Sequence, residues 1–155
     1  MAHYRKIDTR IWNDEKFNSL SPNGQLAFFF ILTHPNLTSL GAMRGTRIGL
    51  SAELPKVFPK AFDEVFDKGF VKDNPKANFI LIPNFLKYNK PENPNVITNW
   101  GKCFDLLPEC DLKDQLLIRV KDSIKDYGKA FQKAFVKAFG KGYPKTGTGT
   151  GAVTG

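Results

Sequence analysis

Apolar residues in the first third of the chain concentrate in one stretch, residues 26–32. Ser21 and Pro22 precede it and mark a helix start, because serine caps unpaired amides and proline tolerates the first helical position. The residue before Pro35 disfavours helical backbone, so the sequence predicts a helix over residues 25–33. Its surface is apolar nearly all round, which is typical of a helix at the centre of a core.

Two more helix starts follow along the chain. Thr46 is a suitable cap for a helix over residues 47–54. Pro59 fits the first position of a third helix, on which apolar residues recur at helical spacing along one face. Gly69 stands where a helix-ending glycine belongs, so the third helix is predicted to reach Lys68.

A change of pattern after the third helix predicts a β-hairpin. Residues 70–71 and 79–82 are apolar, and the stretch between them is polar and rich in turn-forming residues. A glycine-bounded segment, residues 41–45, suits a brief strand or a turn, and residues 4–12 suit a strand or an extended arm. The order of helix, short helix, helix and hairpin indicates a winged helix-turn-helix. The predicted fold class is therefore α+β, mainly α, with additional C-terminal helices.

The second half of the chain predicts further helices. Residues 84–94 are rich in asparagine and proline, and we expect no regular structure there. Asn95 is a suitable cap for a helix that Pro108 ends, and another amphipathic helix is predicted over residues 112–127. The predicted organisation is a winged helix-turn-helix domain with an N-terminal arm at residues 1–90, a helical extension packed on it at residues 91–127, and a basic Lys/Phe repeat with a flexible Gly/Thr tail at residues 128–155.

Charge is uneven along the chain. The net charge is +8, and the segment from Tyr127 onward holds five lysines and no acidic residue. A basic balance favours a polyanionic partner, which is either nucleic acid or an anionic membrane. No apolar stretch is long enough to span a bilayer, and the first twelve residues lack the apolar segment of an export signal. We therefore expect no membrane partner and a cytoplasmic location.

The sequence holds no pattern that indicates catalysis or a bound cofactor. Cys103 and Cys110 lack zinc-ligand spacing and are expected to be reduced, packed thiols. The two histidines, His3 and His34, belong to no catalytic motif. Three carboxylates close in sequence could in principle hold magnesium, but solvated side chains explain them better: Asp8, Asp14 and Glu15. We expect neither an enzyme nor a cofactor nor a metal site.

A winged helix-turn-helix suggests where DNA contacts would lie. The third helix of such a fold enters the major groove, and its N-terminal residues lie nearest the bases. Acidic residues occupy its later positions, Asp63, Glu64 and Asp67, and would repel phosphate, so the helix should dock by its N-terminal end. The candidate DNA-binding residues are Arg44, Arg47, Lys56, Lys60, Lys72 and Lys76. The alternative is that these cations form a solvated surface, since winged helices also serve as protein-contact modules.

The Lys/Phe repeat forms two stripes on one predicted helix. Phe131, Phe135 and Phe139 recur every four residues, and lysines recur with the same spacing. A basic amphipathic helix of this kind can dock on a partner protein, lie on a membrane surface or add phosphate contacts. The stripe can equally pack on the rest of the chain. The candidate partner-binding residues are Trp100, Phe131, Phe135 and Phe139.

Three segments resemble a known family. The stretch YRKIDTRIWNDEKFNSLSPNGQLAFFFILTHPNLTSLGAMRG, together with NFLKYNKPENPNVITNWGK and LLPEC, resembles a group of bacteriophage and prophage replication-initiator or helicase-loading proteins with an N-terminal winged helix. The similarity covers about residues 3–127. The resemblance implies that the winged helix binds origin DNA, that the C-terminal part recruits a helicase or its loader, and that the cytoplasm is that of a bacterial host. It supplies no DNA-contact motif of its own.

Two functions from different classes follow from these observations. The first is a double-stranded DNA-binding accessory protein of phage DNA replication, with a helicase, a helicase loader or another host protein as further candidate partners and a homodimer as a candidate assembly. The second is a phage-encoded interaction module that binds a host replication or defence protein and inhibits or recruits it. In the second case the Trp100 region or the phenylalanine stripe would be the contact surface.

Overall fold

The computed structural model describes residues 4–140, so the predicted Gly/Thr tail lies outside the described residues. The chain divides into two compact units. Within the described part, the first unit comprises residues 4–90 and Leu106–Ser123, and the second comprises Pro91–Asp105 and residues 124–140. The second unit begins at Pro91, and residues 91–127, which the sequence analysis treated as one extension, contribute to both units. The second helix of that extension belongs to the first unit.

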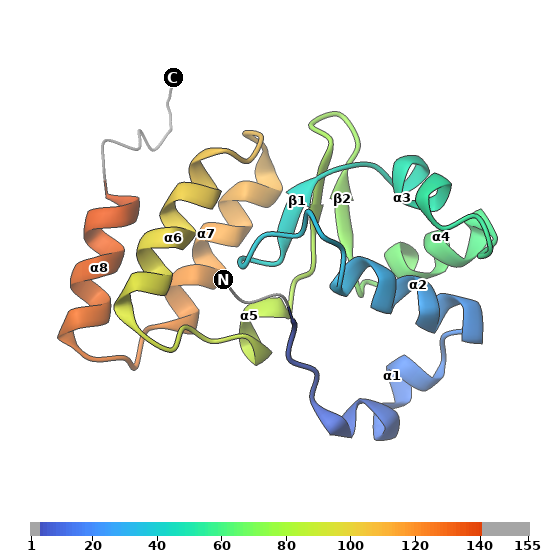
Figure 1. Ribbon diagram of the computed structural model, residues 1–155, viewed down its shortest axis with the longest axis horizontal. Coiled ribbons are helices and arrows are strands. Elements are labelled where there is room, and N and C mark those ends of the chain that lie inside the picture. The colour runs from blue at the N-terminus through green and yellow to red at the C-terminus, as the bar shows by residue number, and fades with distance from the viewer. Residues whose placement is uncertain (1–3, 141–155) are drawn as a thin grey trace. The chain divides into compact units, whose positions relative to one another are not determined.

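The first unit contains one 3₁₀-helix, a set of α-helices and one small sheet (Figure 1). In chain order its elements are η1 (Thr9–Asn13), α1 (Glu15–Asn18), α2 (Pro22–Leu32), β1 (Ala42–Arg44), α3 (Arg47–Glu53), α4 (Pro59–Asp67), β2 (Lys72–Asn74), β3 (Phe79–Leu81), α5 (Phe85–Tyr88) and α7 (Asp111–Ser123). The protein is therefore α+β and mainly helical, as predicted. Residues 4–8 have no regular structure, so the N-terminal segment is an arm that ends in η1 rather than a strand.

The predicted starts of the three central helices are confirmed, including Pro59 at the first position of α4. Oγ of Ser21 accepts a hydrogen bond from the amide of Gly24 at 3.0 Å, and Pro22 takes the first position of α2. Oγ1 of Thr46 accepts from the amide of Gly49 at 2.9 Å at the start of α3. Beyond the C-terminal end of α4, Gly69 has a φ of +84°, in the left-handed region that glycine adopts without a steric penalty.

The three strands form an antiparallel sheet in the order β1-β3-β2. The hairpin is confirmed, but its first strand covers residues 72–74, which the sequence pattern assigned to the turn, and not residues 70–71. Val71 is fully buried and the amide of Phe70 bonds to the carbonyl of Val65, so these two residues close the end of α4 instead. The polar strand β2 pairs at the sheet edge, where its backbone bonds do not require apolar side chains.

The register of the sheet decides which side chains share a face. Phe79 lies opposite both Arg44 and Asn74, and Leu81 lies opposite both Ala42 and Lys72. Directly opposed residues of antiparallel strands point to the same side, and successive residues alternate. Arg44 and Lys72 therefore point to one face, and Asp73 points to the other. Strands β2 and β3 contact α7, and α2, α3 and α4 lie on the opposite side of the sheet from it (Figure 1).

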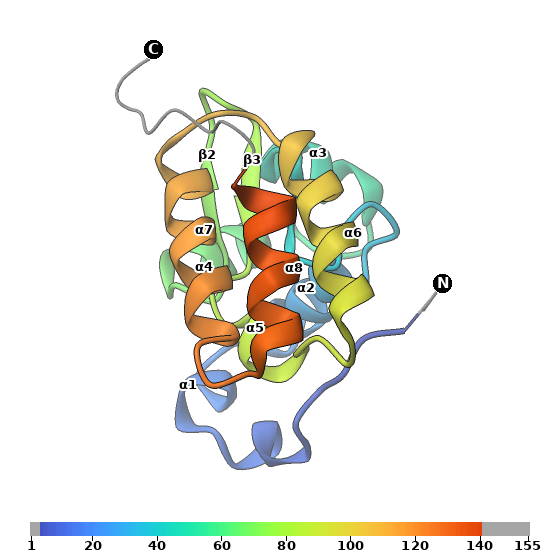
Figure 2. The ribbon, with the colours of Figure 1, turned by 90° about the vertical axis from the view of Figure 1, so that its left-hand side faces the viewer.

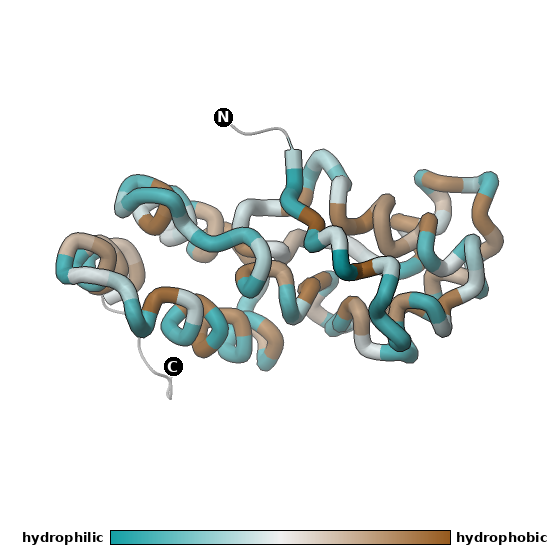
Figure 3. The backbone as a smooth tube through the Cα atoms, turned by 90° about the horizontal axis from the view of Figure 1, so that it is seen from below, coloured by the Kyte–Doolittle hydropathy of each residue, from teal (hydrophilic) through white to brown (hydrophobic). Residues whose placement is uncertain are grey.

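The core of the first unit is built from the faces of α2, α4 and β3. Hydrophobic and hydrophilic residues alternate along most of the chain, as expected for elements that are buried on one face (Figure 3). Helix α2 packs on α4, and α3 packs on α4 as well. The largest fully buried apolar side chains of this unit are Phe17, Ile31, Leu40, Met43, Phe62, Phe79, Ile80, Leu81 and Leu116. Helix α5 was not predicted, because residues 84–94 were expected to have no regular structure.

The second unit consists of α6 (Pro94–Asp105) and α8 (Lys129–Phe139), which lie side by side (Figure 2). They approach closely because Gly101 has no side chain. A Cβ placed at Gly101 would lie 2.8 Å from Cβ and 2.9 Å from the carbonyl oxygen of Ala138. The ring of Phe139 contacts that of Phe104, with centroids 5.3 Å apart. The Lys/Phe repeat is therefore a helix that packs on another part of the chain.

Candidate nucleic-acid interface

Helix α4 buries one face and exposes the other. Its buried residues are Ala61, Phe62, Val65 and Phe66, which recur at helical spacing. That arrangement leaves Lys60, Asp63 and Asp67 exposed on the outer side. No side chain caps the start of α4, and Phe58, the residue at the cap position, is 74% exposed. The start of this helix thus combines a nearby lysine with amides that no side chain of the cap position satisfies.

Arg47 lies at the centre of an ion-pair network and is not a free cation. Its Nε and Nη2 donate to the two carboxylate oxygens of Asp73 at 3.0 and 3.2 Å. Its Nη1 lies 3.3 Å from a carboxylate oxygen of Asp63 and also 3.3 Å from one of Asp67. These hydrogen bonds, above all those to Asp73, raise the pKa of Arg47 further above its ordinary range. Arg47 therefore joins α3 to α4 and β2, and its guanidinium is paired with carboxylates of the protein.

The other five candidate cations are exposed, and none of them forms an ion pair with another residue between 4 and 140. Lys56 and Lys60 flank the start of α4, and Lys76 lies in the turn between β2 and β3. Arg44 and Lys72 point to the sheet face on the side of α7, where Nη2 of Arg44 donates to the carbonyl of Leu106 at 3.4 Å. The six predicted residues therefore do not form one continuous set.

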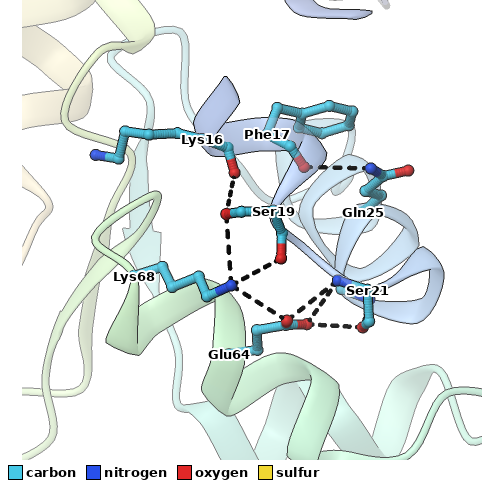
Figure 4. A network of polar contacts seen from close by, with 8 residues as sticks. Lys16, Phe17, Ser19, Ser21, Gln25, Glu64 and Lys68 are labelled. Carbon is cyan, nitrogen blue, oxygen red and sulfur yellow. Dashed lines mark hydrogen bonds and ion pairs between the residues drawn. The ribbon is translucent and has the colours of Figure 1, made fainter. Parts of the chain in front are cut away.

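Glu64 also differs from its expected place, because it does not point outward with Asp63 and Asp67. Its carboxylate accepts from Oγ of Ser21 at 2.7 Å and from the amide of Ser21 at 3.1 Å (Figure 4). Lys68 lies 3.6 Å from the same carboxylate and donates to the carbonyl of Ser19 at 2.8 Å. The hydrogen bond from Ser21 is the main reason that the pKa of Glu64 is lowered. Glu64 thus ties α4 to the start of α2.

The candidate partner-binding aromatic residues are partly buried. Trp100 is 1% exposed and Phe139 is 4% exposed, so neither ring offers a surface to a partner while it stays in place. Phe131 and Phe135 are half-buried. The ring of Phe131 makes an edge contact with Tyr127, and that of Phe135 stacks on Phe139. The rings of the phenylalanine stripe therefore contact mainly other residues of the second unit.

Two of the three carboxylates considered for magnesium have other partners. Both oxygens of Asp8 accept hydrogen bonds from the guanidinium of Arg10, at 2.6 to 3.1 Å, which lowers the pKa of Asp8 to about 2. Oδ1 of Asp14 accepts from the amides of Lys16 and Phe17 and so caps α1. Among residues 4–140 no group of three or more histidine, cysteine, aspartate or glutamate side chains is arranged to hold a metal ion.

Sequence reasoning missed two features of the first unit. One is the Arg47 network, whose acidic partners lie 16 to 26 positions away along the chain. The other is a cavity of about 540 Å³ beside the N-terminal arm. Its residues come from several segments between Lys6 and Asn89, so no local sequence motif could predict it. The one available signal was the interleaving of lysine and aromatic residues at positions 85–88.

In class, the chain is a mainly helical α+β protein with a three-stranded antiparallel sheet, which is compatible with a winged-helix-like arrangement. Comparison with models of protein families, with curated proteins and with solved structures finds no match. In the part of the chain from Tyr4 to Gly140, every helix is too short or too polar to cross a membrane. The function must therefore be argued from the site itself.

Proposed function

We propose that the first unit is a winged helix-turn-helix domain that binds double-stranded DNA and serves phage DNA replication. The observation that supports this best is the order α2-β1-α3-α4-β2-β3 with the strand order β1-β3-β2, in which a helix with an exposed lysine at its start precedes a hairpin with a lysine in its turn. In helix-turn-helix proteins the second helix of the pair enters the major groove by its N-terminal residues. Here α3 and α4 would be that pair.

The charges of α4 favour docking by its start only. Lys56 and Lys60 would neutralise phosphates at the groove edge, and the uncapped amides of the first turn would add hydrogen-bond donors. Asp63 and Asp67 would repel phosphate farther along the helix, but Arg47 holds both of them. Lys76 would reach the backbone of the duplex from the hairpin. Arg47 on this proposal maintains the site and does not contact DNA.

Duplex binding can be tested by fluorescence anisotropy with a labelled duplex at several salt concentrations. The double variant Lys56→Glu/Lys60→Glu should lose affinity by about tenfold or more, because lost phosphate contacts weaken binding and flatten its salt dependence. Lys102→Glu/Lys121→Glu is the matched control, since it changes the net charge equally at two exposed helix positions. An equal loss in both variants, or no duplex binding by the unaltered chain, would contradict the proposal.

A second candidate function is a protein-contact module for a host replication or defence protein. It is favoured by two large apolar side chains at the helix-turn-helix, Ile48, which is 84% exposed, and Phe58, which is 74% exposed. A pull-down from nuclease-treated host lysate separates the two functions, because a complex bridged by DNA disappears. A partner that survives nuclease and is lost with Ile48→Asp/Phe58→Asp would favour this candidate over DNA binding.

A further inference from the structure

The cavity of about 540 Å³ lies within the first unit, between the N-terminal arm and the body of that unit. The arm and the start of α1 supply one wall, from Lys6 to Lys16. The other walls come from α2, from the segment after α4, from the end of β3 and from α5. Its volume is within the range of about 300–1,000 Å³ that is usual for ligand pockets. It exceeds the space that one amino-acid side chain fills.

The lining of this cavity is apolar inside. Five apolar residues from four different segments line it: Phe28, Leu32, Phe70, Ile82 and Phe85. Phe85, Ile82 and Leu32 are nearly fully buried, whereas Phe28 and Phe70 are half-exposed, so their rings offer an apolar surface to a ligand. Such a surface favours a large apolar group, because its burial removes both surfaces from water.

The rim of the cavity carries two exposed lysines, Lys16 and Lys87. Nζ of Lys16 lies 5.6 Å from the ring centroid of Phe70, and Nζ of Lys87 lies 5.5 Å from that of Tyr88. Neither lysine forms an ion pair with any residue in the described part of the chain. Among the acidic residues of the same wall, Asp14 accepts from the amides that start α1, and Asp8 is hydrogen-bonded to Arg10. The charge of Lys87 also helps to lower the pKa of Asp8, but the two side chains form no ion pair.

We propose that this cavity binds an acidic peptide segment of a partner protein that carries one large apolar side chain. The side chain would lie against the apolar residues of the interior, and neighbouring carboxylates would pair with Lys16 and Lys87. A peptide fits better than a nucleic-acid strand, because the two ammonium groups already cover the faces of Phe70 and Tyr88 on which bases would stack. The site shares no residue with the proposed DNA contacts, so it is independent of them.

The binding can be measured with the full chain and three fluorescein-labelled heptapeptides. Each peptide has a central phenylalanine, leucine or tryptophan with three acidic residues on either side. At least one should bind, and replacing its central residue by alanine or its acidic residues by their amides should each weaken binding by about tenfold. Loss of only one of these two dependences, or no binding by any of the three peptides, would overturn the proposal.

Charge-reversal variants test whether the peptide binds at the cavity. Lys16→Glu/Lys87→Glu should weaken peptide binding by about tenfold or more, and Lys102→Glu/Lys121→Glu, with the same change of charge, should leave it within about twofold. Circular dichroism confirms folding of both variants. Equal effects of the two variants would overturn the site, as would a labelled dodecanucleotide that binds in a manner dependent on Lys16 and Lys87 while the peptides do not. The first variant should lose no more duplex affinity than the second.

Discussion

The guanidinium of Arg47 and the carboxylate of Asp73 face each other across α3 and β2 and share two hydrogen bonds, of 3.0 and 3.2 Å. A paired contact of this kind depends on the planar shape of the guanidinium, which presents two N–H groups to two oxygens. The same guanidinium lies 4.5 Å from the ring centroid of Phe66. Arg47 therefore holds the second helix, the third helix and the hairpin of the candidate DNA-binding unit in one arrangement.

Arg47→Lys should lower the free energy of unfolding by about 1–3 kcal/mol, because lysine keeps the charge but loses the paired geometry. Urea unfolding followed by circular dichroism measures this change. Arg44→Lys, at an exposed position with one long hydrogen bond, should change stability by less than about 0.5 kcal/mol. Should Arg47→Lys keep full stability yet lose duplex affinity, Arg47 would be a DNA contact and not a structural residue.

Two glycines with left-handed backbone should respond differently to alanine. Gly41 has a φ of +77° and Gly69 a φ of +84°, so either substitution strains the backbone by about 1–2 kcal/mol. A Cβ at Gly41 would also overlap Phe85, whereas a Cβ at Gly69 would meet no atom within 4 Å. Gly41→Ala should therefore destabilise by about 4 kcal/mol or more and Gly69→Ala by about 1–2 kcal/mol. Thermal unfolding of the two variants tests the difference, and equal losses would contradict the contact with Phe85.

Local signals predicted the three central helices of the first unit well, because each signal acts on the backbone beside it. Ser21 satisfies an amide three residues on, Thr46 does the same, and Gly69 adopts the left-handed backbone that ends a helix. The strand β2 was missed because its three side chains are polar and its strand state depends on pairing with β3. Polar residues at a sheet edge resemble a turn when they are seen without their partner strand.

Contacts between distant positions could not be predicted from the pattern. Arg47 was predicted to be a phosphate contact because basic residues in a helix-turn-helix commonly are, and nothing local pairs it with Asp73, 26 positions later. Helices α6 and α7 are both amphipathic, yet they belong to different units. An amphipathic pattern shows that a face is buried and does not show against what. The phenylalanine stripe of α8 left the same alternatives open, and α6 turned out to be its neighbour.

Glu64→Gln should weaken the contact between α4 and the start of α2 in a pH-dependent way. The pKa of Glu64 is lowered from 4.5 in the folded protein, mainly by the hydrogen bond from Ser21, so ionised Glu64 stabilises the fold above that value. This stabilisation is lost as the pH falls through the lowered pKa. At pH 7 the variant should be less stable by about 1 kcal/mol, and at about pH 2 the difference from the unaltered chain should shrink.

Urea unfolding at the two pH values measures the effect of Glu64→Gln. Asp105→Asn is the control, since Asp105 is exposed and forms no ion pair within residues 4–140. It should give little difference at either pH. A loss in Glu64→Gln that is the same at both pH values would show that the amide disturbs packing and that ionisation of Glu64 does not matter.

Gly101→Leu should separate α8 from α6 without unfolding the first unit. The backbone of α8 lies so close that even a Cβ at Gly101 would come within 2.8 Å of the Cβ of Ala138, and a leucine side chain needs more room still. Hydrogen exchange read by mass spectrometry should show α8 amides exchanging about tenfold faster or more, while those of α4 keep their protection. Gly128→Ala is the control, because a Cβ there meets no atom within 4 Å. If α8 stays protected in Gly101→Leu, the close packing of the two helices does not hold it, and if α4 loses protection equally, the two units do not unfold separately.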